Sequence, residues 1–488
     1  MRSRTLLLAI GLVIATSLPA YARSTLYVSP SPTGDDSRTY VQAQNPLTPW
    51  ATIGRAAWGS TNRAIPNAGQ AAQAGDTVMI TSATYNFAGV VDNRFDAVYN
   101  PVNQGTSSVN RITFQATGPV TLTAPATQSP VIGCNVKNHI VWKGPFSLNE
   151  ASISIHPDTG TVVMTGATGC GVDGISVDGD GDPGYVDNHN GVRIEFCTGC
   201  FVRNSTIFDV NLPSNPNHNQ AGIMLYDSDD TIIEHNYITD VDTAIFVKGV
   251  HGLTSQAGTI IRYNLLVDCG DCVIISFSEN ARVYQNVIRD SGFGIYLLAE
   301  GVDPFRHPVG DWMFNNTIDG MSKACVNGQG SWHENVRVWN NIMTNCAWAN
   351  YFNGNFNSSG AVIDWEHNNY FANNRVAGDN SGNRTTLAQW TAAFTHDLAA
   401  PAAIDTDPRY ADAVSNDFRL CTGAGAPLAG CVGASAARTL GVDLYDLDTD
   451  GSTIDIIPAG AYITNNEVIG PNFGAIQAPT NLRITQTP

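Results

Sequence analysis

The chain has little positive charge. Lysine and arginine together number 25 of 488 residues, against 43 aspartates and glutamates, which gives a net charge of −18. No run of basic residues occurs, so the surface does not attract a phosphate backbone and we expect no nucleic acid partner. To bind an anionic polysaccharide, this acidic chain needs a local cluster of cationic side chains or a bound divalent cation that makes the electrostatic potential positive there.

Long apolar runs are also scarce. Beyond the first residues, no apolar stretch approaches the roughly 18 residues that a membrane helix needs, so we expect no membrane span. The one apolar run follows Arg2 and Arg4 and precedes Ala20-Tyr-Ala22, which has small residues at both outer positions. This is the pattern of a secretory signal peptide. We therefore expect residues 1–22 to be cleaved and the mature chain to be secreted, to the periplasm or the extracellular space.

The cysteines fit an oxidising compartment. There are 10 of them, and some should form disulfides. Cys197-Thr-Gly-Cys200 and Cys269-Gly-Asp-Cys272 have the spacing of redox or zinc motifs, but neither lies in a βαβ context. Structural disulfides or buried thiols are therefore favoured over redox chemistry for these two pairs. Cys421 and Cys431 are expected to close a small C-terminal loop.

An asparagine followed by branched or aromatic residues recurs seven times, at intervals of 22 to 32 residues. A period in the twenties that tolerates insertions is typical of a solenoid, in which each repeat is one coil. The neighbouring Val, Ile, Tyr and Thr favour strands over helices. We therefore predict an all-β parallel β-helix. The seven asparagines are Asn204, Asn236, Asn264, Asn286, Asn316, Asn341 and Asn369.

Several segments resemble the N-terminal section of secreted right-handed β-helix proteins of the pectate-lyase-like superfamily. They are Leu26-Tyr-Val-Ser-Pro30, Pro49-Trp-Ala-Thr-Ile53 and Ala74-Gly-Asp-Thr-Val78, and the similarity extends to about residue 370. The resemblance implies a right-handed single-stranded parallel β-helix with an N-terminal cap over 23–371. Residues 372–478 would then be the last coils and a C-terminal cap, and 479–488 a tail. The superfamily includes lyases, hydrolases, epimerases and non-catalytic binders, so the resemblance is specific for fold. We expect a monomer.

One strand of each coil opens with a small residue, which allows five coils to be aligned. The second and fourth residues of these strands are apolar throughout, and side chains alternate along a strand, so these positions should point into the coil. The third and fifth positions should point outwards. They read Arg193, Met224, Phe246, Ile274, Tyr296 and Glu195, Tyr226, Lys248, Ser276, Leu298.

Neighbouring coils lie about 4.8 Å apart, so Glu195, Tyr226 and Lys248 should form one outward row with Arg193 beside it. An acid, a phenol and an amine in successive coils make a candidate active site. The alternative interpretation is a structural ladder of favourable cross-strand pairs. Exposed Phe246 and Tyr296 would suit stacking against sugar rings, and Phe246 could equally lie beneath a loop. Two histidines that precede their strands, His189 and His218, are candidates for one edge of the substrate site.

Long insertions favour a groove on this side, because loops on one side of a repeat scaffold usually build the binding face. They are 178–187, 211–217 and 300–307.

For β-elimination on a uronate polymer, we assign Lys248 as base, Tyr226 as acid and Arg193 as the group that binds the sugar carboxylate. A lysine at its ordinary pKa of about 10.4 is charged, so it needs desolvation or cationic neighbours to act as a base. Calcium could help to neutralise the substrate, with Glu195, Asp227 and Asp242 as candidate ligands.

The region 242–276 resembles the catalytic region of the chondroitinase-B and alginate-lyase type of β-helix, in which acidic residues precede a strand lysine and an arginine follows one coil later. The position of that arginine falls at about Ser276 here.

Other functions stay open. An inverting glycoside hydrolase needs two carboxyl groups, which Glu195 with Asp227, or Asp227 with Asp229 and Asp230, could supply. A uronate epimerase and a non-catalytic polysaccharide-binding protein or adhesin are further alternatives. Residues 446–451 form the first half of an EF-hand-like loop, but Ile457 stands where that loop has a glutamate, which favours an acidic turn.

Overall fold

The computed structural model describes residues 23–471, apart from short gaps. The gaps are 88–95, 124–129, 150–159, 180–188, 211–218, 250–255, 300–307, 331–332, 354–362, 380–381, 395, 444–446 and 450–454. The predicted signal peptide, His218, the tail 479–488 and most of the three long insertions lie outside the described residues. No helix among the residues that the structure covers is long and apolar enough to cross a membrane.

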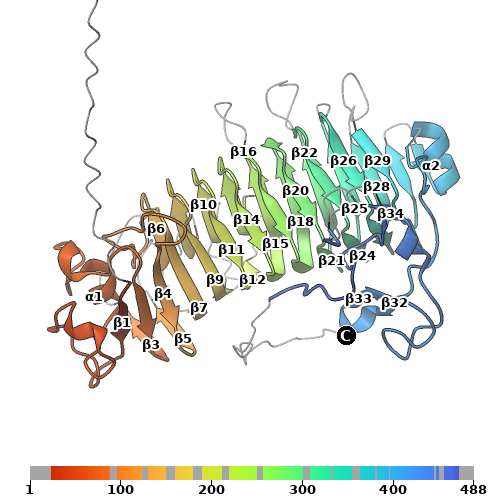
Figure 1. Ribbon diagram of the computed structural model, residues 1–488. Coiled ribbons are helices and arrows are strands. Elements are labelled where there is room, and N and C mark those ends of the chain that lie inside the picture. The colour runs from red at the N-terminus through yellow and green to blue at the C-terminus, as the bar shows by residue number, and fades with distance from the viewer. Residues whose placement is uncertain are drawn as a thin grey trace, which may run out of the picture.

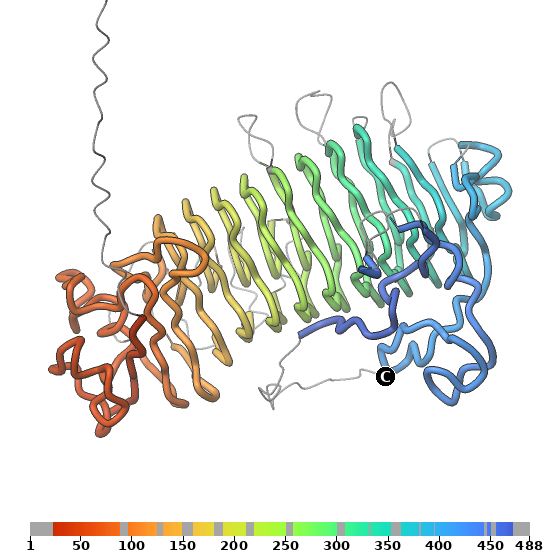
Figure 2. The backbone as a smooth tube through the Cα atoms, viewed as in Figure 1, coloured from red at the N-terminus to blue at the C-terminus, as the bar shows by residue number. Residues whose placement is uncertain are grey.

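The chain winds into a parallel β-helix whose coils stack along one axis (Figures 1 and 2). Each full coil contributes strands to three walls, which we call walls 1, 2 and 3. The predicted all-β right-handed parallel β-helix is therefore confirmed.

Wall 1 is built from β6 (Ile132–Asn135), β8 (Val162–Thr165), β10 (Asn190–Glu195), β13 (Ala221–Tyr226), the second halves of β15 (Tyr237–Lys248) and β18 (Leu265–Ser276), β22 (Phe293–Leu298), β25 (Ala324–Gln329), β28 (Trp348–Asn353) and β30 (Ala377–Asp379).

Wall 2 is built from β1 (Thr25–Val28), β2 (Thr77–Ile80), β4 (Ile112–Ala116), the first halves of β7 (Ile140–Asn149) and β9 (Gly171–Asp178), β11 (Phe201–Arg203), β14 (Ile232–Glu234), β17 (Ile260–Arg262), β20 (Arg282–Tyr284), β23 (Trp312–Phe314), β26 (Val336–Trp339) and β29 (Ile363–Glu366).

Wall 3 is built from β3 (Ala83–Asn86), β5 (Val120–Thr123), the second halves of β7 and β9, β12 (Thr206–Val210), the first halves of β15 and β18, β21 (Val287–Arg289), β24 (Thr317–Asp319) and β27 (Ile342–Thr344). Two further short strands, β16 (Gln256–Ala257) and β19 (Ser278–Glu279), pair in parallel at a corner between coils.

Inside the corner between walls 2 and 3, asparagine side chains form a continuous ladder. Between asparagines, the amide Oδ1 accepts from the backbone N–H and the Nδ2 of the ladder residue one coil earlier, as Asn264 does from Asn236 at 3.0 Å. At the first step, Asn236 Oδ1 accepts from the backbone N–H of Ser205 at 3.0 Å. The central asparagines of the sequence repeat belong to this ladder, and at its two ends the ladder position falls one residue from the repeat, at Ser205 and Asn368. The ladder runs through Ser205, Asn236, Asn264, Asn286, Asn316, Asn341 and Asn368.

Caps close both ends of the solenoid. At the start, α1 (Ile53–Trp58) covers the first coils, and its N-cap Thr52 accepts from the backbone N–H of Arg55 at 3.1 Å. At the other end, α2 (Leu387–Phe394) places Trp390 against Phe352, and the pairs β30 with β31 (Gly382–Arg384), β32 (Tyr410–Asp412) with β33 (Asp417–Leu420), and β34 (Gly441–Val442) with β35 (Ile456–Ile457) follow.

The C-terminal segment then turns back along the outside of the solenoid (Figure 1). The backbone N–H of Gly470 donates to Tyr263 O at 2.8 Å, and Nδ1 of His235 lies 2.9 Å from Val468 O. Residues after the last coil therefore also cover the corner between walls 2 and 3 of earlier coils.

Cysteines lie in the coil interior or in the C-terminal loop. Disulfides join Cys134 to Cys170, Cys325 to Cys346 and Cys421 to Cys431, so the predicted C-terminal loop is confirmed. The two Cys-X-X-Cys pairs are buried free thiols. Disulfides fit an extracytoplasmic protein.

A buried carboxyl at the corner before wall 2 makes stability depend on pH. Asp311 is 0% exposed, accepts from Ser278 Oγ at 2.5 Å and from Ala281 N at 2.7 Å, and burial raises its pKa to about 7. The pKa of Asp311 is higher in the folded protein than its ordinary value of 3.8. Protonated Asp311 therefore stabilises the folded state fully below pH 3.8, and this contribution to the free energy of unfolding is lost as the pH rises through about 7.

From this group we expect the free energy of unfolding of the natural protein to fall by about 2–3 kcal/mol between pH 5 and pH 8. Asp311→Asn keeps the shape of the side chain and stays neutral, so the variant should not show this fall. Urea unfolding of both proteins at the two pH values measures this. An equal pH dependence in the variant would show that Asp311 is not the responsible group.

Candidate functional site

The register of wall 1 is the one that the sequence predicts. Tyr226 pairs with Glu195 on one side and with Lys248 on the other, and Phe246 pairs with Met224 and Ile274. The second and fourth positions of these strands are all buried in the main core: Val192, Ile194, Ile223, Leu225, Ile245, Val247, Val273, Ile275, Ile295 and Leu297. The third and fifth positions therefore face outwards from the coil.

Four of the predicted residues lie together near the C-terminal ends of three adjacent strands of wall 1. They are Arg193 and Glu195 on β10, Tyr226 on β13 and Lys248 on β15. Nε of Arg193 lies 3.0 Å from Oε2 of Glu195, and the Arg193 guanidinium lies 4.3 Å from the centre of the Tyr226 ring. Nζ of Lys248 lies 5.8 Å from the same ring centre. The phenol of Tyr226 thus has a cation on each neighbouring strand.

The amine of Lys248 is held in place by two further contacts. Its Nζ donates to Oδ1 of Asn219 at 2.7 Å and lies 5.4 Å from the centre of the Phe246 ring. Asn219 was not among the residues predicted from the sequence. It lies beside the 211–218 insertion, and its only sequence signal is that position.

Tyr226 is a protonated phenol at neutral pH, as tyrosines ordinarily are. The residue is 7% exposed, and burial raises the pKa of the phenol, with Arg193 opposing the rise and Glu195 adding to it. The hydroxyl therefore carries a proton that it can donate.

The outward aromatic side chains are less accessible than expected. Phe246 is 1% exposed and Tyr296 is 9% exposed, and they form an apolar cluster with Met224 and Ile274 outside the main core. The expectation of an exposed stacking surface is therefore wrong at Phe246, whose outward side chain is buried. Sugar binding by Tyr296 stays a prediction; its hydroxyl is hydrogen-bonded to Gln329.

His189 does not line an open edge. Its side chain is 1% exposed and lies before β10, at the opposite end of that strand from Glu195. A substrate role for His189 stays a prediction that needs the side chain to become accessible.

The three acidic residues predicted as calcium ligands do not converge. Asp227 lies beside Lys248, because its backbone N–H donates to Lys248 O at 3.3 Å. Asp242 is six residues before Lys248 on one strand, which places it about 20 Å away. A joint site with Glu195 and Asp227 is therefore wrong for Asp242. Among the residues described, no three or more His, Cys, Asp or Glu side chains are grouped closely enough to hold a metal.

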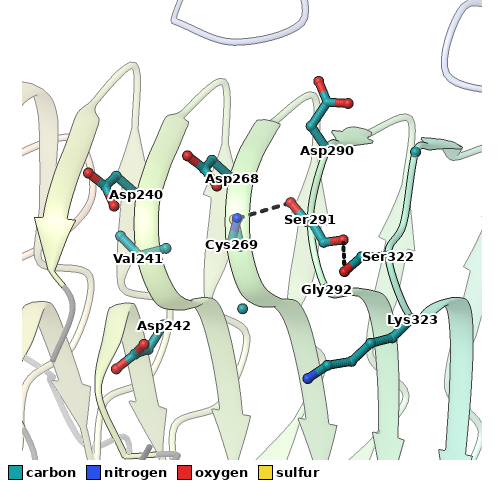
Figure 3. Close-up of a pocket in the computed structure, with 12 residues that line it drawn as sticks. Asp240, Val241, Asp242, Asp268, Cys269, Asp290, Ser291, Gly292, Ser322 and Lys323 are labelled. Carbon is teal, nitrogen blue, oxygen red and sulfur yellow. Dashed lines mark hydrogen bonds between the residues drawn. The ribbon is translucent and has the colours of Figure 1, made fainter. Parts of the chain in front are cut away.

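A shallow groove of about 660 Å³ lies at the corner between walls 3 and 1 (Figure 3). Asp240, Asp268 and Asp290 line one side on successive coils, and Asp242 and Lys323 flank the floor. The floor is formed by Gly270 and Gly292, where a Cβ would come within 2.7 and 2.2 Å of backbone oxygens of the previous coil.

The carboxylates of this groove influence one another. Burial raises the pKa of Asp268, and the neighbouring Asp240 and Asp290 raise it further. All three have positive φ, from 50 to 54°, where aspartate is better tolerated than most residues, so turn geometry alone also accounts for them. The groove was not predicted, although Asp268 and Asp290 each stand two residues before a glycine, which was a readable signal.

The strand pairing defines the class: this is a parallel β-helix protein. The family model of NosD, described as a periplasmic copper-binding protein, matches residues 146–360, just under half of the chain. No curated protein matches the chain.

Several solved structures are similar to the chain at low identity. The complex of XylC with xylose is 14% identical over 79% of this chain and 87% of that chain, with a TM-score of 0.43. An alginate lyase from Paenibacillus sp. str. FPU-7 is 14% identical over 60% and 92%, with a TM-score of 0.39. The Azotobacter vinelandii mannuronan C-5 epimerase AlgE6 A-module is 12% identical over 68% and 89%, with a TM-score of 0.39.

Proposed function

We propose that the chain is an exported polysaccharide lyase that cleaves an acidic, uronate-containing polysaccharide by β-elimination at the Arg193, Tyr226 and Lys248 row. The observation that carries the proposal is the position of the Tyr226 phenol between a guanidinium and an amine on adjacent strands. Export is supported by the disulfides and by the N-terminal sequence.

The proposed roles follow from the chemistry. Arg193 binds the sugar carboxylate, which makes the C5 proton more acidic. Lys248, in its neutral form, takes that proton; the C5 electron pair forms the C4–C5 double bond, and the C4–O bond breaks. Tyr226, a phenol that is protonated at neutral pH, gives its proton to the leaving oxygen. Proton transfer from Lys248 to Tyr226 through solvent restores both groups.

Calcium enters the proposal as a further means of neutralising the carboxylate. Of the predicted ligands, Glu195 and Asp227 flank Tyr226, and Asp242 does not. Glu195 already pairs with Arg193, so calcium would compete with that ion pair.

Products decide between the candidate reactions. The mature protein is incubated with pectate, alginate and glycosaminoglycans, with and without calcium. A lyase creates unsaturated ends that absorb in the ultraviolet, and a hydrolase creates reducing ends without that absorbance. Changed sugar composition without cleavage indicates an epimerase, and binding alone indicates an adhesin. Absence of unsaturated ends on every acidic polymer contradicts the lyase.

A second candidate, a glycoside hydrolase, is favoured by the corner groove. Asp268 has the raised pKa expected of a general acid. Its partner carboxylate, Asp240 or Asp290, lies one coil away, about 4.8 Å along the axis, which is close to the carboxyl separation of retaining enzymes. Reducing ends that disappear in Asp268→Asn but persist in Lys248→Ala would assign the activity to this groove.

A further inference from the structure

Wall 2 carries a row of arginines in contact with aromatic rings. The outward column of β11, β14, β17, β20, β23 and β26 is in register, and these strands lie side by side along the axis (Figure 1). We call this column the wall 2 stripe. It consists of Phe201, Ile232, Ile260, Arg282, Trp312 and Arg337.

Trp312 lies between two arginines. The guanidinium of Arg282 is 4.2 Å and that of Arg337 is 4.5 Å from the centre of the indole ring. Nη1 of Arg282 also donates to Ala281 O at 3.0 Å and to Gly310 O at 2.7 Å, which fixes its orientation. The side chain of Arg337 is 37% exposed.

A similar arrangement occurs at the other end of the stripe. The guanidinium of Arg203 lies 4.8 Å and that of Arg111 lies 5.3 Å from the centre of the Phe201 ring. The ring lies over Gly171, where a Cβ would come within 2.5 Å of it. Arg203 pairs with Asp173 at 3.1 Å and remains 40% exposed. Each end of the stripe therefore presents two arginines held by one ring.

The charge of this surface differs from that of the whole chain. The outward positions of β11 to β26 carry Arg203, Arg262, Arg282 and Arg337 against one acid, Glu234, and that acid is paired with Arg262 at 2.7 Å. Asp364 lies 3.8 Å from Nε of Arg337. Acids at the adjacent corner, Glu279 and Glu334, flank the stripe. On the six strands themselves positive charge exceeds negative charge, and the neighbouring acids Asp173, Asp364, Glu279 and Glu334 bring the surface close to neutral, on a chain of net charge −18.

We propose that the wall 2 stripe is a second, non-catalytic binding site for an anionic polysaccharide that lies along the axis of the β-helix. A guanidinium stacked on a ring keeps its N–H donors in the plane of the group, and these donors bind a carboxylate or sulfate in two-pronged fashion. Ile232 and Ile260 offer apolar contact between the two ends.

The stripe selects long ligands. Phe201 and Trp312 are four coils apart, which is roughly 19 Å, so a ligand must be an oligomer to contact both pairs of arginines. The stripe lies on a different wall from Lys248, so one polymer molecule could be held there while its cleavage takes place on wall 1. The proposal relies on the proposed function only for the source of the ligand, because binding is measured without turnover.

Binding to immobilised pectate tests the proposal, in the Lys248→Ala background so that no cleavage occurs. We expect Arg282→Gln with Arg337→Gln to weaken binding at least tenfold and to reduce its salt dependence. The matched control is Arg438→Gln, a half-buried arginine of the C-terminal cap, which should leave binding unchanged. Retained folding of each variant is checked by its thermal unfolding. Unchanged affinity of the double variant, or equal binding of a neutral dextran, would overturn the proposal.

Arginine labelling by phenylglyoxal locates the ligand on the surface without any substitution. Pectate should protect Arg337 and Arg203 from modification and leave Arg438 in the same sample unprotected. Equal labelling with and without pectate would overturn the proposal. Protection at Arg337 in a protein that forms no unsaturated product supports this binding site and contradicts the lyase, so the two proposals can fail separately.

Discussion

Replacing Asn286 by alanine is expected to lower the free energy of unfolding by about 4 kcal/mol or more. Asn286 is 0% exposed, and its Nδ2 donates to Ile261 O, Tyr284 O and Asn316 Oδ1 at 3.0 to 3.1 Å. Its Oδ1 accepts from the backbone N–H and Nδ2 of Asn264, both at 3.0 Å. The alanine variant leaves these buried groups without their partner and adds a cavity.

Chemical denaturation of the two proteins measures this loss. The matched control is Asn383→Ala on β31, an exposed asparagine, which we expect to change stability by less than about 0.5 kcal/mol. A loss at Asn286 no greater than at Asn383 would show that the ladder does not hold the coils together.

Replacing Lys248 by alanine is expected to lower the rate of unsaturated product formation by about 10²- to 10⁴-fold, because the proposed base is lost.

Tyr226→Phe keeps the ring between Arg193 and Lys248 but removes the proton that the leaving oxygen receives. We expect it to lower kcat by a similar factor with little change in KM. Initial rates over a range of polymer concentrations separate the two parameters.

The control for lysine replacement is Lys137→Ala, whose Nζ donates to Val102 O at 2.9 Å. Lys137 follows β6, four coils before the coil of Lys248. Full activity of Lys137→Ala together with loss in Lys248→Ala supports the site. Activity retained in Lys248→Ala would place the chemistry elsewhere.

The sequence predicted the register of wall 1 because two constraints act together. Side chains alternate along a strand, and each strand begins with a small residue, so one alignment satisfies five coils. The same constraint brought Glu195, Tyr226 and Lys248 into one row. The alternation of side chains does not predict how exposed an outward-facing residue is. Phe246 faces outwards as predicted, yet it is buried.

The ends of the asparagine ladder show a second limit. Asn204 has a φ of 51° and occupies the turn, whereas Ser205 fills the ladder position. Near the other end, Asn368 and Asn369 are adjacent, and the sequence pattern cannot distinguish the ladder residue from its neighbour. Turn and ladder positions both favour asparagine, one for its positive φ and the other for its amide.

Position along a strand was a third source of error. Asp242 was grouped with Asp227 because it precedes the segment that carries Lys248, but the six residues from Asp242 to Lys248 span about 20 Å when extended. The return of the C-terminal segment over His235 and Tyr263 had no repeat pattern that could predict it.

The mass of the new non-reducing ends, released from pectate or alginate by the mature protein, tests the central claim most directly. Elimination breaks the C4–O bond without adding water, so each new non-reducing end should be one water lighter than a hydrolytic end, and this product should be absent with Lys248→Ala. New non-reducing ends with the mass of a hydrolytic end, in which one water has been added, would contradict the lyase. The aspartates of the corner groove would then be tested next.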